Sequence, residues 1–152
     1  MTESQQEVER QLTAALAFWG AASVLVGGVV WGAGSSDRWI AFGRQTAAWG
    51  AIDLVIAGVG TMRSRRRAGP PSHEDRGRLH RVLVVNSVLD VGYVAAGTAL
   101  AVRSDAVAES ITRRMPGRRY GAAELRGDGA AIVVQGLFLL GLDTMFAVRT
   151  RG

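Results

Sequence analysis

The chain has 152 residues, enough for one domain and too few for two, and 48% of them are hydrophobic while 20% are charged. This composition fits neither a disordered chain nor a small disulfide-rich secreted domain, and the lack of cysteine excludes disulfides, thiolate metal sites and cysteine nucleophiles. The net charge is +5, with every basic residue an arginine. Because the arginines cluster between apolar stretches instead of lining a soluble face, we expect no nucleic-acid partner.

Four apolar segments follow one another along the chain. Residues 11–34 contain no charged residue, and about 20 apolar residues in a helix cross a hydrocarbon core of roughly 30 Å. Residues 39–62, 82–102 and 129–148 are similar, but each contains a lone aspartate: Asp53, Asp90 and Asp143. Helices that are apolar nearly all round favour a lipid environment. The sequence therefore predicts an all-α fold, a four-helix transmembrane bundle forming a single integral membrane domain over residues 1–152.

Two further patterns refine this prediction. Gln45 with Asp53 and Gln135 with Asp143 repeat one Gln-x7-Asp spacing, which makes the bundle a candidate pair of related helical hairpins. Residues 105–115 lie between the third and fourth segments and carry apolar side chains along one side, which suggests a short interfacial helix.

The arginines predict how the chain is oriented. More of them lie on the side of the two termini, and the densest cluster directly follows the second segment: Arg63, Arg65, Arg66 and Arg67. The positive-inside rule then places both termini in the cytoplasm. The same cluster is a candidate site for anionic lipid, so the expected partner is the lipid bilayer itself.

Polar residues inside the segments are the candidate functional groups. Asn86, Asp90 and Tyr93 share one helical face, and the aspartates of the other segments must also point inward, since a charged carboxylate in mid-membrane costs about 3 kcal/mol. One interpretation is a site for a proton, a cation or a small polar ligand. The other is a set of interhelical hydrogen bonds, which contribute only about 0.6 kcal/mol each.

Two motifs carry a resemblance to a known family. The third segment reads N-x-x-L-D-x-G-Y-x-x-x-G from Asn86 to Gly97, and the fourth reads Q-G-x-F-L-x-x-x-D from Gln135 to Asp143. Together with Trp49-Gly50 and Asp53, these resemble an uncharacterised bacterial family of small four-helix membrane proteins, a domain of unknown function. The resemblance implies a bacterial inner-membrane protein without implying an activity. It singles out seven residues as ligand- or proton-binding candidates: Trp49, Asp53, Asn86, Asp90, Tyr93, Gln135 and Asp143.

Other chemistry has little support. The only histidines, His73 and His80, are too few and too closely spaced for a zinc site or a bis-histidine haem, so we expect no metal, no cofactor and no catalytic residues. An enzyme is therefore disfavoured. Two hypotheses remain: a membrane protein that binds or moves a proton, cation or polar ligand, with a homo-oligomer as its expected transporting form, or an accessory subunit that docks against a larger membrane complex.

Overall fold

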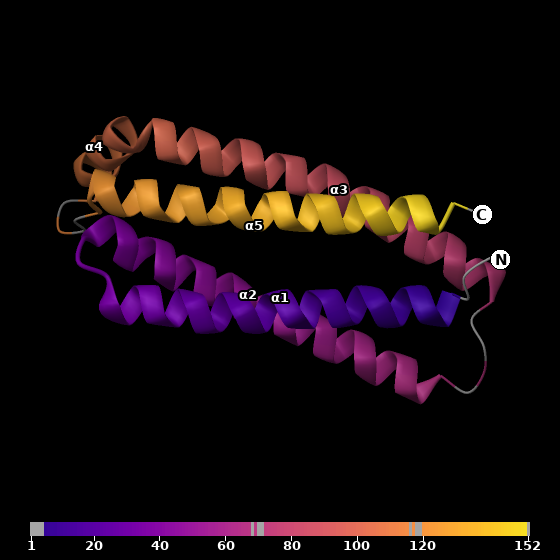
Figure 1. Cartoon of the computed structure of the whole chain (residues 1–152). Coiled ribbons are helices and arrows are strands. Elements are labelled where there is room, and N and C mark those ends of the chain that lie inside the picture. The colour runs from indigo at the N-terminus through magenta and orange to yellow at the C-terminus, as the bar shows by residue number, and fades with distance from the viewer. Residues whose placement is uncertain (1–4, 68, 70–71, 116, 118–119, 152) are drawn as a thin grey trace.

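The computed structural model describes residues 5–67, 69, 72–115, 117 and 120–151. Within these residues the chain forms five α-helices (Figure 1): α1 Gln5–Ala33, α2 Asp37–Arg66, α3 His73–Val102, α4 Ser104–Arg114 and α5 Ala122–Arg149.

The prediction of a four-helix transmembrane bundle is wrong in two respects, although the all-α class is correct. Five helices are present among the described residues, because residues 104–114 form a helix of their own. Three helices in this part of the chain are long and apolar enough to cross a membrane: α1, α3 and α5. The second predicted span, in α2, does not meet that standard, because Arg44, Gln45 and Asp53 and several glycines interrupt its apolar residues.

The long helices form two antiparallel hairpins. α1 packs along α2, α3 packs along α5, and α2 joins the hairpins through its contact with α5. As Figure 1 shows, both termini lie at one end of the molecule, and α2 and α5 run in the same direction. The two hairpins match the predicted pairing of segments, whereas their relation as a sequence repeat stays a prediction.

Glycines allow the two helices of each hairpin to pack closely against each other. A Cβ on Gly50 of α2 would lie 2.6 Å from the carbonyl oxygen of Gly20 on α1, and a Cβ on Gly129 of α5 would lie 2.6 Å from that of Gly97 on α3. No larger residue fits at either crossing without moving a backbone. Small residues that let backbones approach in this way are typical of helix packing in membranes.

Capping explains why α3 begins well before its apolar segment. The Ser72 hydroxyl accepts a hydrogen bond from the Asp75 backbone N–H, and the Asp75 carboxylate accepts one from the Ser72 backbone N–H. This capping box satisfies N–H groups that the first helical turn leaves unpaired. The polar start of α3 is thus helical, and His80 is brought alongside the end of α5.

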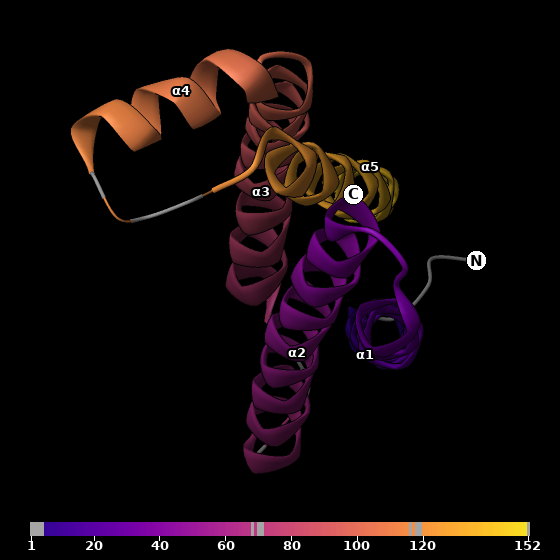
Figure 2. The same ribbon diagram turned by 90° about the vertical axis from the view of Figure 1, so that its left-hand side faces the viewer.

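The helix predicted within residues 105–115 is present as α4, and Figure 2 shows it extending sideways from one end of the bundle. Arg126 of α5 holds its first turn, with hydrogen bonds of 3.0 Å to the Ser104 hydroxyl and 2.8 Å to the Asp105 carboxylate. Its position at a membrane surface stays a prediction. At the opposite end, a small apolar core joins three helices: Val8 of α1, Leu83 of α3, and Leu142, Phe146 and Ala147 of α5.

Candidate functional site

One face of α5 carries a line of buried polar residues, which we call the polar face of α5. Its members are separated by seven, eight and seven positions, a spacing that keeps them on the same side of a helix: Asp128, Gln135, Asp143 and the C-cap residue Thr150. At 1.5 Å per residue the line is about 33 Å long, close to the thickness of a hydrocarbon core. Each member contacts a different part of the surrounding bundle.

Asp128 lies at the end where α4 is attached. Nη2 of Arg44 on α2 lies 3.3 Å from both carboxylate oxygens of Asp128. A Cβ on the adjacent Gly127 would meet the carbonyl oxygen of Arg38, so the glycine brings α2 and α5 together here. The apolar pattern does not indicate the Arg44–Asp128 pair, because Asp128 falls just outside the fourth apolar segment, residues 129–148. Its spacing from Gln135 and Asp143 is the signal that identifies it.

Gln135 connects three helices at the next level. Its Nε2 donates a hydrogen bond to Asp53 of α2, and its Oε1 accepts one of 2.9 Å from the indole Nε1 of Trp19 on α1. Asp53 is 1% exposed and Gln135 is 3% exposed. The Trp19 ring also stacks on Phe138 with the ring centroids 3.9 Å apart. Nothing in the sequence distinguishes Trp19 from the other tryptophans as a partner of Gln135.

Asp143 pairs with Asp90 of α3, about 12 Å further along α5. Its carboxyl group is within hydrogen-bonding reach of the Asp90 carboxyl and the Asn86 amide. Both aspartates are buried, and Oδ2 of Asp90 meets no donor group in the described parts of the chain. Because an ionised carboxylate only accepts hydrogen bonds, a bond between the two carboxyls requires a proton on one of them.

The two aromatic candidates meet each other. Trp49 of α2 and Tyr93 of α3 form an edge-to-face pair with centroids 5.4 Å apart. Nε1 of Trp49 and Oγ1 of Thr46, one turn away on α2, are buried without a hydrogen-bond partner among the residues that the structure describes. Both atoms belong to the stretch of α2 between Arg44 and Asp53.

His80 closes the line at the end that carries the termini. Its Nδ1 lies 3.0 Å from the carbonyl oxygen of Ala147 and 3.0 Å from the Thr150 hydroxyl. The sequence excludes His80 as a zinc or haem ligand without indicating this contact, because Thr150 lies 70 positions further along the chain.

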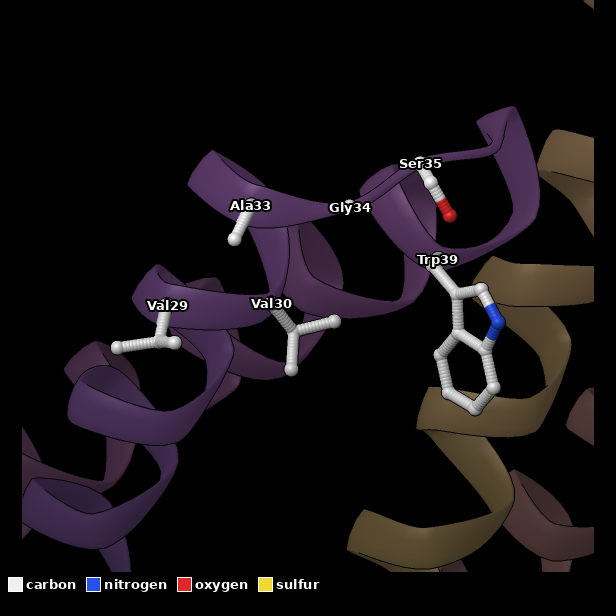
Figure 3. Close-up of a pocket in the computed structure, with 6 residues that line it drawn as sticks. All are labelled: Val29, Val30, Ala33, Gly34, Ser35 and Trp39. Carbon is white, nitrogen blue, oxygen red and sulfur yellow. The ribbon is translucent and has the colours of Figure 1, made fainter.

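The seven predicted site residues thus form three groups. Asp53 meets Gln135, Asp143 meets Asn86 and Asp90, and Trp49 meets Tyr93. In the described ranges, no set of three or more His, Cys, Asp or Glu side chains is arranged to hold a metal ion. An open hollow lies away from these groups, beside the turn between α1 and α2 (Figure 3), and is lined mostly by apolar residues: Val29, Val30, Ala33, Gly34, Ser35 and Trp39.

Comparison with known proteins identifies the family. Residues 15–144 match the model of a family of unknown function (DUF6992), and the chain belongs to it. No curated protein and no solved structure matches the chain. This membership agrees with the expected family of unknown function. That the protein is bacterial, and that the two motifs are typical of the family, stay predictions.

Proposed function

We propose that this member of the DUF6992 family is an integral membrane protein whose Asp90–Asp143 pair binds and releases a proton. Three apolar helices are compatible with a membrane protein, and many of their outward side chains are large and hydrophobic. In lipid such an exposed surface is stable, whereas in water patches of this extent are rare on monomers. α2 packs against both α1 and α5, and its Asp53 side chain is buried.

The orientation that we propose places both termini in the cytoplasm of a bacterial cell. The arginine cluster after the second apolar segment supports it, as does the position of both termini at one end of the molecule (Figure 1). Arg67 pairs with Glu9 at 2.9 Å, which leaves the exposed side chains of Arg63, Arg65 and Arg66 for anionic lipid headgroups.

The observation that carries the proposal is the contact between two buried carboxyl groups. Asp90 is 3% exposed and Asp143 is 7% exposed. The third side chain of the group is the neutral amide of Asn86, which bonds to Asp143. Two carboxyl groups in contact do not both ionise in a site of low dielectric constant, so the pair holds one proton between them. A shared proton in a buried pair is the arrangement that lets a membrane protein take up and release protons.

The test is thermal unfolding in detergent between pH 4 and pH 9. The folded pair keeps a proton that the unfolded chain releases above about pH 4, so stability falls as the pH rises, by at most about 1.4 kcal/mol per pH unit for one proton. Asp90→Asn supplies a donor to Asp143 that needs no proton, so we expect the variant to lose the part of this dependence that comes from the pair, while the buried carboxyls of Asp53 and Asp128 keep theirs. Asp37→Asn, at an exposed aspartate in the first turn of α2, is the matched control and keeps it.

His80 must be separated from the pair, because its Nδ1 lies 3.0 Å from the Thr150 hydroxyl at the C-cap of α5, the helix that carries Asp143. The series is therefore repeated in a His80→Gln background. A wild-type protein whose stability does not change with pH, together with an Asp90→Asn variant that is only less stable, contradicts the proposal and leaves the pair as a packing contact.

A second candidate is an accessory subunit of a larger membrane complex, and the outer side of α1 favours it. Gly28 and Gly32 face open space relative to the described residues, unlike Gly20 and Gly27, which meet α2. An exposed G-x-x-x-G spacing suits the close approach of another membrane helix. Gly28→Leu would then abolish co-purification of a specific membrane protein without lowering the stability of the isolated chain. A chain that is monodisperse alone and unaffected by this change speaks against the accessory role, and self-association indicates a homo-oligomer.

A further inference from the structure

We propose that the polar face of α5 is a path for protons between the two faces of the membrane, running from His80 through Asp90–Asp143 and Asp53 to Asp128. This inference rests on the proposed proton site at Asp90–Asp143. It adds that the site connects with the solvent at both ends of the bundle and not at one end only.

The first support is the regular placement of titratable groups along the bundle. His80 contacts Thr150, Asp90 contacts Asp143, Asp53 contacts Gln135, and Asp128 contacts Arg44. Successive contact points lie about 10 to 12 Å apart along α5 and together cover about 33 Å. Three or four water molecules, joined by hydrogen bonds of about 2.8 Å, bridge such an interval.

The second support is the position of the buried polar atoms that lack a partner within the described residues. Oγ1 of Thr46 and Nε1 of Trp49 belong to the part of α2 between Arg44 and Asp53, and Oδ2 of Asp90 belongs to the aspartate pair. Buried polar atoms normally bond to protein or to ordered water. The Thr46 and Trp49 atoms therefore anchor water in the interval between Asp53 and Asp128, and Oδ2 of Asp90 is available for a proton or for water beside the aspartate pair.

The chemistry of one passage balances. A proton arriving from the His80 end adds to the ionised partner of the Asp90–Asp143 pair and makes both carboxyls neutral. The pair then releases one proton through water to the ionised Asp53 carboxylate, which passes it on toward Asp128. The pair returns to one shared proton, no bond to carbon changes, and the driving force is the difference in proton electrochemical potential.

The packing favours protons over larger ions. The glycine crossings bring the helix backbones of each hairpin together, and hydrogen bonds from Gln135 and Trp19 close the middle of the bundle. A hydrated ion needs an open channel, whereas a proton moves along hydrogen-bonded groups without one. The Arg44 guanidinium pairs with Asp128 and neutralises its charge, so this end offers no net negative charge to hold a metal cation.

The experiment measures proton flux into liposomes that contain the purified protein. A potassium diffusion potential drives the flux, and a pH-sensitive dye inside the liposomes reports it. We expect wild-type flux clearly above that of protein-free liposomes, and at least a tenfold loss for Asp143→Asn and Asp53→Asn, with correct folding checked by size-exclusion elution and thermal stability.

Thr46→Val is the most discriminating variant, because it removes a buried hydroxyl that has no hydrogen-bond partner among the described residues. If the hydroxyl only packs, its removal leaves flux unchanged and stability equal or higher. If it anchors water in the path, flux falls severalfold in a protein that is at least as stable. Thr98→Val is the matched control and keeps its flux, since the Thr98 hydroxyl is exposed and bonds to the Val94 carbonyl of its own helix at 2.7 Å.

Two results overturn the proton path. Either wild-type flux equals that of protein-free liposomes, or Thr46→Val and Asp53→Asn conduct as well as the wild type. If the pH-dependent stability of the wild type persists in these cases, the proton site at Asp90–Asp143 stands and only the path is lost. If that pH dependence is also absent, the proposed function fails with it.

Discussion

At the scale of single residues, the same amino acid has different roles at different positions of one helix. α2 contains Gly50, whose backbone lies against α1. It also contains Gly58, where an added Cβ would meet no described atom within 4 Å beyond the glycine's own stretch of helix. A glycine in a helix interior is less favourable than alanine by about 1 kcal/mol. Gly50 is therefore required by the close contact of two backbones, whereas no contact within the described part of the chain requires Gly58.

Gly50→Ala and Gly58→Ala test this difference. A Cβ at position 50 would lie 2.6 Å from the Gly20 carbonyl oxygen, so the hairpin must open, and we expect a loss of about 2 kcal/mol in the free energy of unfolding. At position 58 we expect no loss, or a gain of up to about 1 kcal/mol from helix propensity. Unfolding in mixed detergent micelles measures both. Equal effects at the two positions would show that the glycine crossing does not hold the hairpin.

The sequence predicts which residues belong to the site better than it predicts which of them contact each other. Asn86, Asp90 and Asp143 are recognisable because each lies in an apolar segment and must turn inward. Their pairing, and that of Gln135 with Asp53 and Trp19, depends on the rotation and offset of helices far apart in the sequence. Arg44 shows the limit clearly, since its partner Asp128 lies 84 positions away on a helix whose start the apolar pattern places too late.

At the scale of helices, apolar length predicts α1, α3 and α5 well and predicts their ends poorly. The polar first turns of α3 and α5 are helical because Asp75 and Glu124 each accept a hydrogen bond from the backbone N–H three residues earlier. α2 is long without being apolar enough to count as a span, because it supplies polar side chains to α5. Its place in the fold comes from packing, which hydropathy does not measure.

The attachment of α4 is a property of this scale that a single substitution can test. Arg126→Gln removes the charged hydrogen bonds to Ser104 and Asp105, which are partly exposed and contribute about 1 kcal/mol. We expect backbone amides of residues 104–114 to exchange hydrogen about fivefold faster, while those of α5 are unchanged.

Arg113→Gln is the control for this prediction, because within the described residues Arg113 pairs with Glu109 of its own helix, at 2.9 Å and at an exposed position. Exchange in α4 that responds equally to both substitutions would mean that the tether to α5 does not fix the helix, and that α4 is held by its own residues.

At the scale of the whole molecule, the proposed orientation of the chain in the membrane can be tested by labelling introduced cysteines. The chain has no cysteine, so a single introduced thiol is the only target for a maleimide that does not cross membranes. Ser64 lies at the end of the bundle that carries the termini, and Thr112 of α4 lies at the other end; both are exposed.

In sealed right-side-out vesicles we expect Thr112→Cys to react with the maleimide and Ser64→Cys to be protected, and in inside-out vesicles the reverse. The physical reason is the arginine cluster around Ser64, which favours the cytoplasmic side. The opposite pattern would mean that the termini face outward, and labelling of both thiols in both preparations would mean that the protein does not span the membrane.

The hydrogen bond between Gln135 and Asp53 also has a consequence for the order in which the chain is made. The two residues are 82 positions apart, so at 5 to 20 residues per second Asp53 leaves the ribosome roughly 4 to 16 s before its amide partner. During that time the buried carboxyl group has no Gln135 to meet, and α2 is held by α1 alone through the Gly20–Gly50 crossing. Completion of this polar contact is therefore coupled to the last long helix, because α5 supplies the amide that bonds to Asp53.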